Sequence, residues 1–407
     1  MKRVLMIAYH FPPLAGSSGV QRTLRFVQHL PQHGWEPLVL TAHPVAYQRI
    51  SADLLADVPA RTVVQRAFAL DTARHLAIKG RYPGGWARPD RWASWRFDAV
   101  RRGMAMIKAL RPDAIWSTYP IPTAHRIAAE LHRRSGLPWI ADFRDPMVQD
   151  NYPPDPRTWQ QFQTIEQEAA ARARWCVFTT PGALRTYQAR YPHSMDRMVL
   201  VENGYDEQSF AGKEAAARDK GPLTPGRLTL LHSGIVYPAE RDPTQLFEAL
   251  ARVVRGPAPL PLQLRLRAPV HDALLRQLAE RHGLQSFVEI LPPVPYAEAL
   301  EEMLRADGLL VLQAANCNDQ VPAKLYEYLR AKRPILCLSD PEGDTRQSLG
   351  AAGVNAGARL DDAQDIERLL REFCRAAPTA FLPDDEAVRR ASREQRTQRL
   401  VECLEAV

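Results

Sequence analysis

The chain has 407 residues, 45% hydrophobic and 24% charged, which favours a globular protein of two domains over a disordered one. No apolar run approaches the roughly 20 residues needed to cross a bilayer. The charge is uneven, with 27 − 16 = +11 over residues 1–205 and 26 − 30 = −4 over residues 206–407, which suggests an anionic partner (membrane surface, phosphorylated acceptor or nucleic acid) or only an arginine-rich composition.

The five cysteines are odd in number and contain no CxxC pair. This pattern favours reduced thiols and argues against a disulfide framework or a zinc site. The first short apolar run has no cleavage pattern after it, so we expect a buried first strand there and not a signal peptide. The expected compartment is the cytoplasm.

The first half of the chain reads as strands that alternate with helices, which predicts a mostly parallel sheet covered on both faces. Between residues 74 and 95 the pattern dissolves into a stretch rich in tryptophan, arginine and turn formers. The expected strands are 4–8, 37–41, 62–65, 114–117, 138–143, 175–180 and 198–202, and the expected helices are 20–33, 97–110, 123–135, 159–174 and 182–190.

A polar segment rich in glycine and proline, residues 211–227, predicts the domain boundary. The alternation of strands and helices restarts beyond it, and the chain is expected to end in one amphipathic helix near 387–404. The expected strands of the second half are 228–231, 262–267, 287–291, 308–313 and 334–339, and its expected helices are 242–254, 272–282, 296–305, 322–331, 345–352 and 361–375.

A loop of small residues, Gly16, Ser17, Ser18 and Gly19, joins the first strand to the first helix. Such residues let backbone N–H groups and a helix N-terminus approach an anion closely. The spacing matches neither GxGxxG nor a Walker A motif, and a plain strand–helix loop stays an equal alternative. Arg22, at the start of the helix, could face a bound phosphate or solvent.

Three charged residues, Asp142, Arg144 and Asp145, lie at the end of a strand that is apolar enough to be buried. Unpaired buried charge is costly, so the three either pair among themselves or serve a ligand. We favour a ligand, because ligands of open α/β sheets bind at the carboxyl ends of the strands.

Two further strand ends carry candidate residues. Gly234 follows the first strand of the second half, with Arg241 seven residues later, which offers a close backbone approach and a cation. Tyr119 and His125 lie in another strand-to-helix loop, although a lone histidine is more often structural.

Residues 308–339 read as strand, loop, helix and strand, with Pro322 in the first helical turn. Asp319 and Glu327 are eight residues apart, and Lys324 lies one turn before the glutamate. These charged residues are expected where an open α/β sheet would hold a nucleotide.

Motifs of several other classes are missing from the sequence. There is no GxSxG, HExxH, kinase signature or metal-binding DxD flanked by apolar residues, and no RRM, zinc-finger or helix-turn-helix pattern. We therefore expect no nucleic-acid partner.

The segment VPAKLYEYLRAKRPIL resembles the donor-binding motif of glycosyltransferase family 4, a group of GT-B glycosyltransferases. In that family the second of two acidic residues eight apart binds the ribose of a nucleotide sugar, and Glu327 matches it. YHFPPLAGSSGVQR resembles the family's glycine-rich loop, STYPIPTAH and IADFRDP its acceptor-side loops, and HSGIVY the start of its donor domain. The resemblance covers nearly the whole chain.

Three positions depart from the family pattern. Apolar residues follow Gly234 where the family has an arginine, Arg241 stands for the family's lysine, and Lys324 supplies the missing cation. Residues 142–145 replace a histidine that many members have at that strand end. Asp319 replaces a glutamate, so its carboxylate is one methylene shorter.

The resemblance implies two Rossmann-like α/β domains facing each other across a cleft, with the C-terminal helix returning to the first domain. The expected domains are 1–210 for the acceptor and 228–386 for the donor, joined by the linker 211–227 and followed by the helix 387–407.

The implied reaction is a retaining transfer from a nucleotide diphosphate sugar to an acceptor hydroxyl, with no metal and no cofactor. In such enzymes the departing phosphate takes the acceptor's proton, so no protein nucleophile is needed. The residues assigned are Asp142, Arg144, Asp145 and Asp319 as catalytic; Gly16, Ser17, Ser18, Gly19, Gly234, Arg241, Lys324, Leu325 and Glu327 as donor-binding; and Arg22, Tyr119 and His125 as acceptor-binding.

The expected acceptor belongs to cell-surface polysaccharide or glycolipid synthesis. The stretch WARPDRWASWRF combines aromatic and basic residues, which favours a peripheral contact with an anionic membrane, at the inner face of the cell membrane. The alternatives are a soluble small-molecule acceptor, a non-catalytic nucleotide-sugar-binding protein and an epimerase of the same fold.

Overall fold

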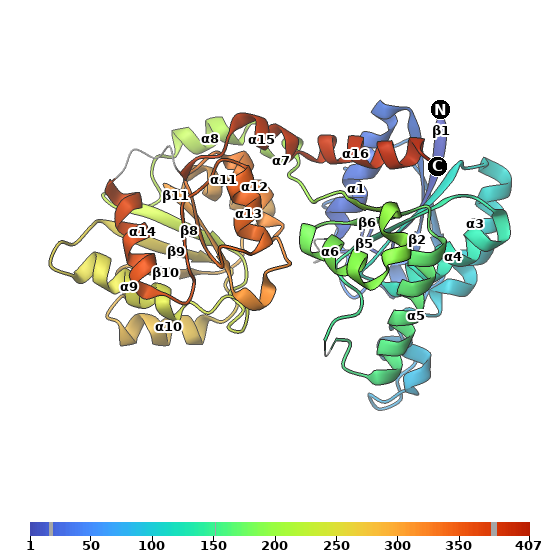
Figure 1. Ribbon diagram of the computed structural model, residues 1–407, viewed down its shortest axis with the longest axis horizontal. Helices are drawn as coiled ribbons and strands as arrows, with labels where there is room; N and C mark the ends of the chain where they lie inside the picture. Colours follow the sequence, from blue (N-terminus) through green and yellow to red (C-terminus); the bar gives the residue numbers. More distant parts are fainter. Residues whose placement is uncertain (16–18, 151, 376–380) are drawn as a thin grey trace. The chain divides into compact units, whose positions relative to one another are not determined.

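The structure is a computed structural model that describes residues 1–15, 19–150, 152–375 and 381–407. The chain divides into two compact units (Figure 1): residues 1–203 with 393–407, and residues 204–392. Each unit is a parallel sheet with helices on both faces, as the alternating pattern predicts.

The sheet of the first unit has, among the described residues, seven parallel strands in the order β3-β2-β1-β4-β5-β6-β7. Its strands are β1 (Lys2–Ile7), β2 (Trp35–Ala42), β3 (Val63–Ala67), β4 (Ala114–Thr118), β5 (Trp139–Arg144), β6 (Trp175–Phe178) and β7 (Met198–Leu200). Its α-helices are α1 (Gly19–His29), α2 (Thr72–His75), α3 (Trp95–Leu110), α4 (Pro122–Ser135), α5 (Pro156–Arg172), α6 (Pro181–Arg190) and α16 (Arg393–Glu405).

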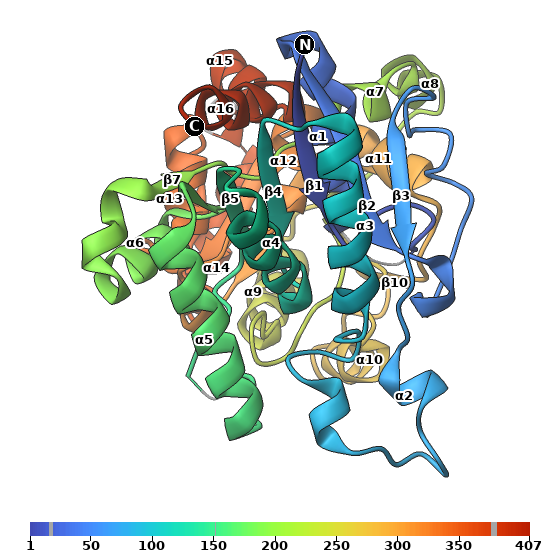
Figure 2. The ribbon, with the colours of Figure 1, turned by 90° about the vertical axis from the view of Figure 1, so that its right-hand side faces the viewer.

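Alternation along β1 builds two cores on the two faces of this sheet. Leu5 and Ile7 belong to the core that includes residues of α3 and α4, while Val4 and Met6 belong to the core formed with α1 and α16. Figure 2 shows α3 and α4 on one face of the sheet. The C-terminal helix thus packs on the first unit, against α1, as predicted.

The sheet of the second unit has, within the described part of the chain, six parallel strands in the order β10-β9-β8-β11-β12-β13. Its strands are β8 (Leu228–Ser233), β9 (Leu262–Arg267), β10 (Val288–Leu291), β11 (Gly308–Gln313), β12 (Ile335–Ser339) and β13 (Gly357–Ala358). Its α-helices are α7 (Glu207–Phe210), α8 (Lys213–Asp219), α9 (Thr244–Arg255), α10 (Asp272–Arg281), α11 (Tyr296–Arg305), α12 (Lys324–Ala331), α13 (Asp344–Ala351), α14 (Ala363–Arg375) and α15 (Asp385–Arg390).

In both sheets the strands are added on both sides of a central pair of strands. In the first unit the chain goes from β1 to β2 and β3, then returns to place β4 on the other side of β1. In the second unit β8 and β11 have the same relation. The carboxyl ends of such central strands are the topological switch points where open α/β sheets bind ligands.

Three of the differences from the expected boundaries concern the domain limits and α12. Residues 204–219, expected to end the first domain and begin a linker, form α7 and α8 of the second unit, because Phe210 and Ala217 belong to its core. The helix expected from Pro322 begins at Lys324. The single helix expected over 387–404 is two helices, α15 and α16, separated at 391–392 where the chain passes between the units.

Candidate functional site

Lys324 is the first residue of α12 and lies against the end of β8 in the second unit. Its Nζ is 3.1 Å from Nε2 of His232, whose Nδ1 is 2.9 Å from the carbonyl of Leu310. A carbonyl oxygen only accepts, so Nδ1 carries the proton and Nε2 accepts from the ammonium group. His232 is therefore a neutral residue that holds Lys324 in place.

The charge of Lys324 is strongly disfavoured where it lies. Burial, and then the neighbouring Arg241 cation, lower the pKa of Lys324 to about 7, while Glu327 acts in the opposite direction. Burial, followed by the Lys324 cation, holds the pKa of His232 well below its usual range. A cation with so low a pKa is a group that an anionic ligand would stabilise.

Gly234 makes the close approach of Lys324 possible. Its φ is +121°, a conformation that other residues rarely adopt, and a Cβ there would lie 2.8 Å from Nζ of Lys324. Its own N–H donates to the carbonyl of Arg267 at 2.8 Å. A side chain at this position would displace the ammonium group.

Arg241 supplies the second cation of this site. Its Nη1 donates to the carbonyl of Ile235 at 2.8 Å, and its guanidinium lies over the ring of Tyr237, 5.2 Å from the centroid. Its Nε is buried without a hydrogen-bond partner among the described residues. Such an orphaned donor is available to a ligand.

The two carboxylates of the expected motif differ in their surroundings. Glu327 is half-buried on α12 and accepts a hydrogen bond from the hydroxyl of Tyr296 at 2.7 Å. Asp319 is exposed in the loop between β11 and α12. Asn318 fixes that loop, because its Nδ2 donates to Asp340 at 3.1 Å and its carbonyl accepts from the N–H of Asp344 at 2.7 Å.

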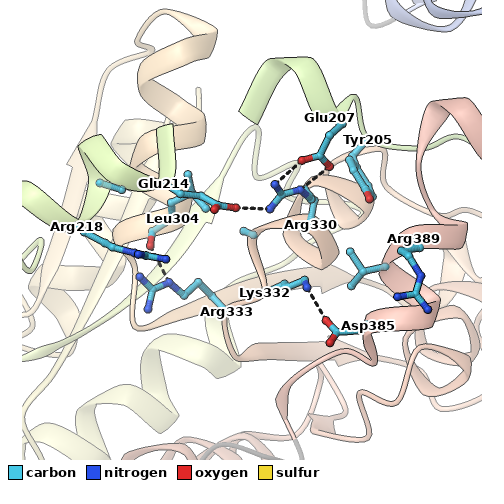
Figure 3. A pocket seen from close by; sticks show the side chains of 13 residues that line it. Tyr205, Glu207, Glu214, Arg218, Leu304, Arg330, Lys332, Arg333, Asp385 and Arg389 are labelled. Atoms are coloured by element: carbon cyan, nitrogen blue, oxygen red, sulfur yellow. Dashed lines mark hydrogen bonds and ion pairs between the residues drawn. The ribbon is translucent and has the colours of Figure 1, made fainter. Parts of the chain in front are cut away.

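The rest of α12 is structural. The side chain of Leu325, a predicted donor-binding residue, is fully buried in a core of the second unit. At the other end of the helix, Arg330 bonds both carboxylate oxygens of Glu207 at 2.5 and 2.7 Å and one oxygen of Glu214 at 2.6 Å (Figure 3). A charged hollow of 660 Å³ surrounds these ion pairs.

In the first unit the predicted residues Arg22 and Asp142 bind each other. The guanidinium of Arg22 donates to both carboxylate oxygens of Asp142, at 2.7 and 3.0 Å, and the two side chains are 2% and 0% exposed. Thr118 donates to the same carboxylate at 2.8 Å. The charges of this pair are therefore satisfied within the cluster at this strand end, which favours a structural role.

Arg144 lies differently, next to the start of α1. It has a left-handed φ of 59°, its Nε is buried with no hydrogen-bond partner among the described residues, and Thr179 donates to its carbonyl at 2.6 Å. A Cβ on Gly19 would lie 2.6 Å from its Nη1 and 2.4 Å from Nδ1 of His10. Gly16, Ser17 and Ser18 lie outside the described residues.

His10 is a residue that sequence reasoning missed. Burial, with a smaller contribution from the Arg144 cation, lowers the pKa of His10 to about 4, so the imidazole is neutral at neutral pH. Its place just after β1 could have identified it, because ligands of open α/β sheets bind at the carboxyl ends of the strands, and Gly19 and Arg144 were predicted to lie at such ends. His10, Gly19 and Arg144 together form the candidate site of the first unit.

The remaining predicted residues of the first unit are distributed as follows. His125 is fully buried, its Nδ1 is 2.8 Å from the hydroxyl of Ser117, and burial lowers its pKa to about 4. Tyr119 is 4% exposed and belongs to the core that includes residues of α3 and α4. Asp145 is exposed directly after β5. His125 is thus a core histidine, the alternative that the sequence had already favoured.

A second missed residue, Glu166 on α5, fixes the segment that follows β5. Its fully buried carboxylate accepts from the hydroxyls of Tyr187 and Tyr191 at 2.6 and 2.7 Å and from Arg190 at 2.5 Å. The N–H of Val148 donates to it at 3.2 Å. No sequence spacing distinguishes this glutamate from Glu168, the partly exposed glutamate two residues later on α5.

The described residues contain neither a metal-binding cluster nor a membrane-spanning helix. No group of three or more His, Cys, Asp or Glu side chains in that part of the chain is placed to hold a metal ion. No helix in the described ranges is both long and apolar enough to span a membrane.

Comparison with known proteins identifies relatives. Residues 18–204 match the family model of a glycosyl transferase 4-like domain. A comparison with curated protein sequences gives no match. Among solved structures, Anabaena HepE in complex with UDP matches with a TM-score of 0.69 and 14% identity over 100% of both chains.

Two further structures show the same fold. Sucrose-phosphate synthase from Thermosynechococcus elongatus has a TM-score of 0.67 and 13% identity over 100% of this chain and 99% of that one. The lipopolysaccharide outer core galactosyltransferase WaaB has a TM-score of 0.65 and 12% identity over 99% of each. Residues 18–204 thus match the glycosyl transferase 4-like family, and the whole chain has the GT-B fold of these solved glycosyltransferase structures.

Proposed function

We propose that the chain transfers a sugar from a nucleotide diphosphate sugar to an acceptor hydroxyl, and that the second unit binds the donor. The observation that carries this proposal is the pair of cations at the end of β8, Lys324 with its lowered pKa and Arg241 with its orphaned Nε. A diphosphate would satisfy both, because it brings negative charge and several acceptor oxygens.

The other residues proposed to bind the donor substrate are assigned from their positions relative to Lys324 and Arg241. Glu327 lies one turn after Lys324 on α12 and is proposed to accept hydrogen bonds from the ribose hydroxyls. Asp319, in the loop before α12, is proposed to contact the sugar. HepE has been solved with UDP and with UDP-glucose, which supports a nucleotide sugar as the donor here.

In the proposed mechanism the protein stabilises the leaving group. Charge develops on the diphosphate as the bond to the sugar breaks, and fixed cations aimed at it lower the barrier. The departing phosphate takes the proton of the acceptor hydroxyl, and the sugar keeps its anomeric configuration. This route is proposed to use no metal ion and no cofactor.

In the first unit, His10, Gly19 and Arg144 are the groups proposed to receive the acceptor or the phosphates. Arg144 has a sparsely populated backbone conformation and a buried nitrogen with no partner among the described residues, two features that are common at functional sites. Asp145 is the remaining predicted catalytic residue that is exposed there. The glycine-rich loop 16–19 is proposed to contribute backbone N–H groups.

The proposed acceptor belongs to cell-surface polysaccharide or glycolipid synthesis in the cytoplasm, at a membrane surface. WaaB, a lipopolysaccharide galactosyltransferase by name, supports this class of acceptor. A soluble small-molecule acceptor is the second candidate, and sucrose-phosphate synthase has the same fold.

Donor turnover followed by NMR tests this proposal. The protein is incubated with UDP-, GDP-, ADP- and dTDP-sugars, and the first-formed anomer of the released or transferred sugar is recorded with and without EDTA. We expect turnover of one donor class with retention and no effect of EDTA. Glu327→Ala should reduce turnover at least tenfold, whereas Glu298→Ala, an exposed glutamate on α11, should not.

Inversion of the anomer, loss of turnover in EDTA, or full activity of Glu327→Ala would each contradict one stated part of the proposal: the stereochemistry, the metal independence or the site.

A further inference from the structure

An apolar hollow of 460 Å³ lies in the first unit, between α2, the segment 84–97 and the first turns of α3 and α4. Leu76 and Pro89 line it, together with Trp86 and Phe97. Trp86 is 55% exposed and Phe97 is 74% exposed, which is unusual for side chains of this size. The volume is in the range of sites that take small apolar ligands.

The wall of this hollow is fixed by buried polar contacts, although the segment has little regular structure. Asp71 is fully buried and binds Arg91 at 2.6 Å. The carboxylate of Asp90 accepts from the N–H of Trp92 and from the N–H of Thr123, each at 2.9 Å. The hollow is therefore a formed feature that exists before any ligand binds.

Two half-buried arginines, Arg96 on α3 and Arg126 on α4, line the same hollow. The guanidinium group of neither makes an ion pair or a hydrogen bond with any described residue, and that of Arg96 lies over the ring of Phe97, 5.5 Å from its centroid. Burial, and then the neighbouring Arg96 cation, lower the pKa of Arg126. An anion between the two guanidinium groups would remove this repulsion.

We propose that this hollow binds an anionic phospholipid of a membrane surface, with the acyl chain in the hollow and the phosphate on Arg96 and Arg126. Exposed aromatic residues beside cations are the combination that favours the membrane interface. The excess of 27 − 16 = 11 positive charges over residues 1–205 acts in the same direction. This gives a site to the membrane contact named above and rests on that part of the proposed function alone.

Flotation of the full chain with vesicles tests the site. The vesicles contain phosphatidylcholine alone or a 1:1 mixture with phosphatidylglycerol, at low and at physiological salt. We expect the chain to float with the anionic vesicles, and Trp86→Ser with Phe97→Ser to abolish flotation. Arg96→Gln and Arg126→Gln should each lower the vesicle affinity about fivefold, the effect of one cation near an anionic surface.

Two matched variants separate this site from a general charge or apolar effect. Arg101→Gln removes an exposed cation of the same helix, and Met195→Ser removes an exposed apolar side chain elsewhere in the first unit. Both should float like the unchanged chain. Equal losses for Arg101→Gln and Arg96→Gln would overturn the site.

Two other results would also overturn the proposal. One is the absence of flotation with anionic vesicles. The other is binding of inorganic phosphate to Arg96 and Arg126 with the same affinity as the vesicles. The ligand of the two arginines would then be a soluble anion. Melting temperatures, and the shift on adding UDP, are recorded for every variant, so that misfolding or failure of the donor assignment is seen separately.

Discussion

Lys324 is the residue on which the donor assignment depends most. It lies between the neutral His232 and the cation Arg241, with Gly234 leaving room for its ammonium group. Its pKa of about 7 means that the free protein holds this side chain largely neutral at pH 8. A bound diphosphate would favour the charged form and raise the pKa of Lys324.

This predicts that UDP binding takes up a proton. At pH 8 the terminal phosphate, with a pKa near 6, is already ionised, so the uptake reports Lys324 and should approach about one proton per site. Because binding consumes a proton, the affinity should fall as the pH rises from about 7. Calorimetry in two buffers of different ionisation enthalpy measures the uptake.

Lys324→Met is the control for that measurement. It should bind UDP more weakly, with no proton uptake and an affinity that does not vary with pH between 7 and 9. Proton uptake of unchanged size in Lys324→Met would assign the titration to another group.

The buried pair of Arg22 and Asp142 leads to a prediction about stability. Removal of one partner leaves an unpaired buried charge, so Arg22→Met and Asp142→Asn should each lower the free energy of unfolding, Arg22→Met by about 3–5 kcal/mol. The double variant should lose less than the sum of the two. Denaturant unfolding measures all three, and single variants that keep full stability but lose turnover would make the pair catalytic instead.

The sequence allowed candidate ligand-binding residues to be chosen, but it did not show which side chains bind each other. Lys324, Glu327 and Arg241 could be chosen because motif spacing and strand ends are visible in a sequence. The mutual binding of Arg22 and Asp142 joins residues 120 positions apart, which no local pattern reveals. His125 and His10 look equally isolated in the sequence, yet one is a core residue and the other lies beside Arg144.

At the scale of elements, α12 connects the donor site to the segments that enter and leave the second unit. Its first turn carries Lys324 and Glu327, and its last turn carries Arg330, bound to Glu207 on α7 and Glu214 on α8. Lys332, just after the helix, binds Asp385 on α15 at 2.5 Å. These ion pairs hold the helix in one position relative to α7, α8 and α15.

Arg330→Met should therefore loosen α12 without touching the donor site. The acidic partners are half exposed, so each pair is worth roughly 0.2–1 kcal/mol and the melting temperature should fall by only a few degrees. UDP affinity should fall as well, because Lys324 and Glu327 lose their fixed support. Arg305→Met, which removes a cation from α11 outside these pairs, serves as the control, and equal UDP affinity in Arg330→Met would refute the link.

The elements were predictable wherever their apolar period was strong. The central strands and the helix α12 lie close to their expected positions, since buried parallel strands read as continuous apolar runs. Two predicted boundaries were wrong because tertiary packing, which the local sequence does not show, determines them. Residues 213–219 belong to a polar segment that reads as a linker but form α8, and the continuous pattern over 387–404 is interrupted where the chain passes from the second unit to the first.

At the scale of the molecule, the two units repeat one plan. Each has a parallel sheet whose central strands, β1 with β4 and β8 with β11, form a switch point, and the candidate residues of each unit lie at these ends or, for Arg144, at the end of the neighbouring β5. The alternating pattern and the motif order carry this information, so the fold class could be predicted from the sequence. The acceptor could not, because it depends on loops whose residues follow no common pattern.

A thermal-shift measurement with UDP, GDP, ADP and dTDP tests the central claim most directly. One nucleotide at about 100 times its Kd should raise the melting temperature by about 5–10 °C. Lys324→Met should lose most of this shift, while Lys220→Met, which removes an exposed lysine of the second unit outside α12, should keep it. No shift with any of the four nucleotides, or a full shift in Lys324→Met, would contradict a donor site at the end of β8.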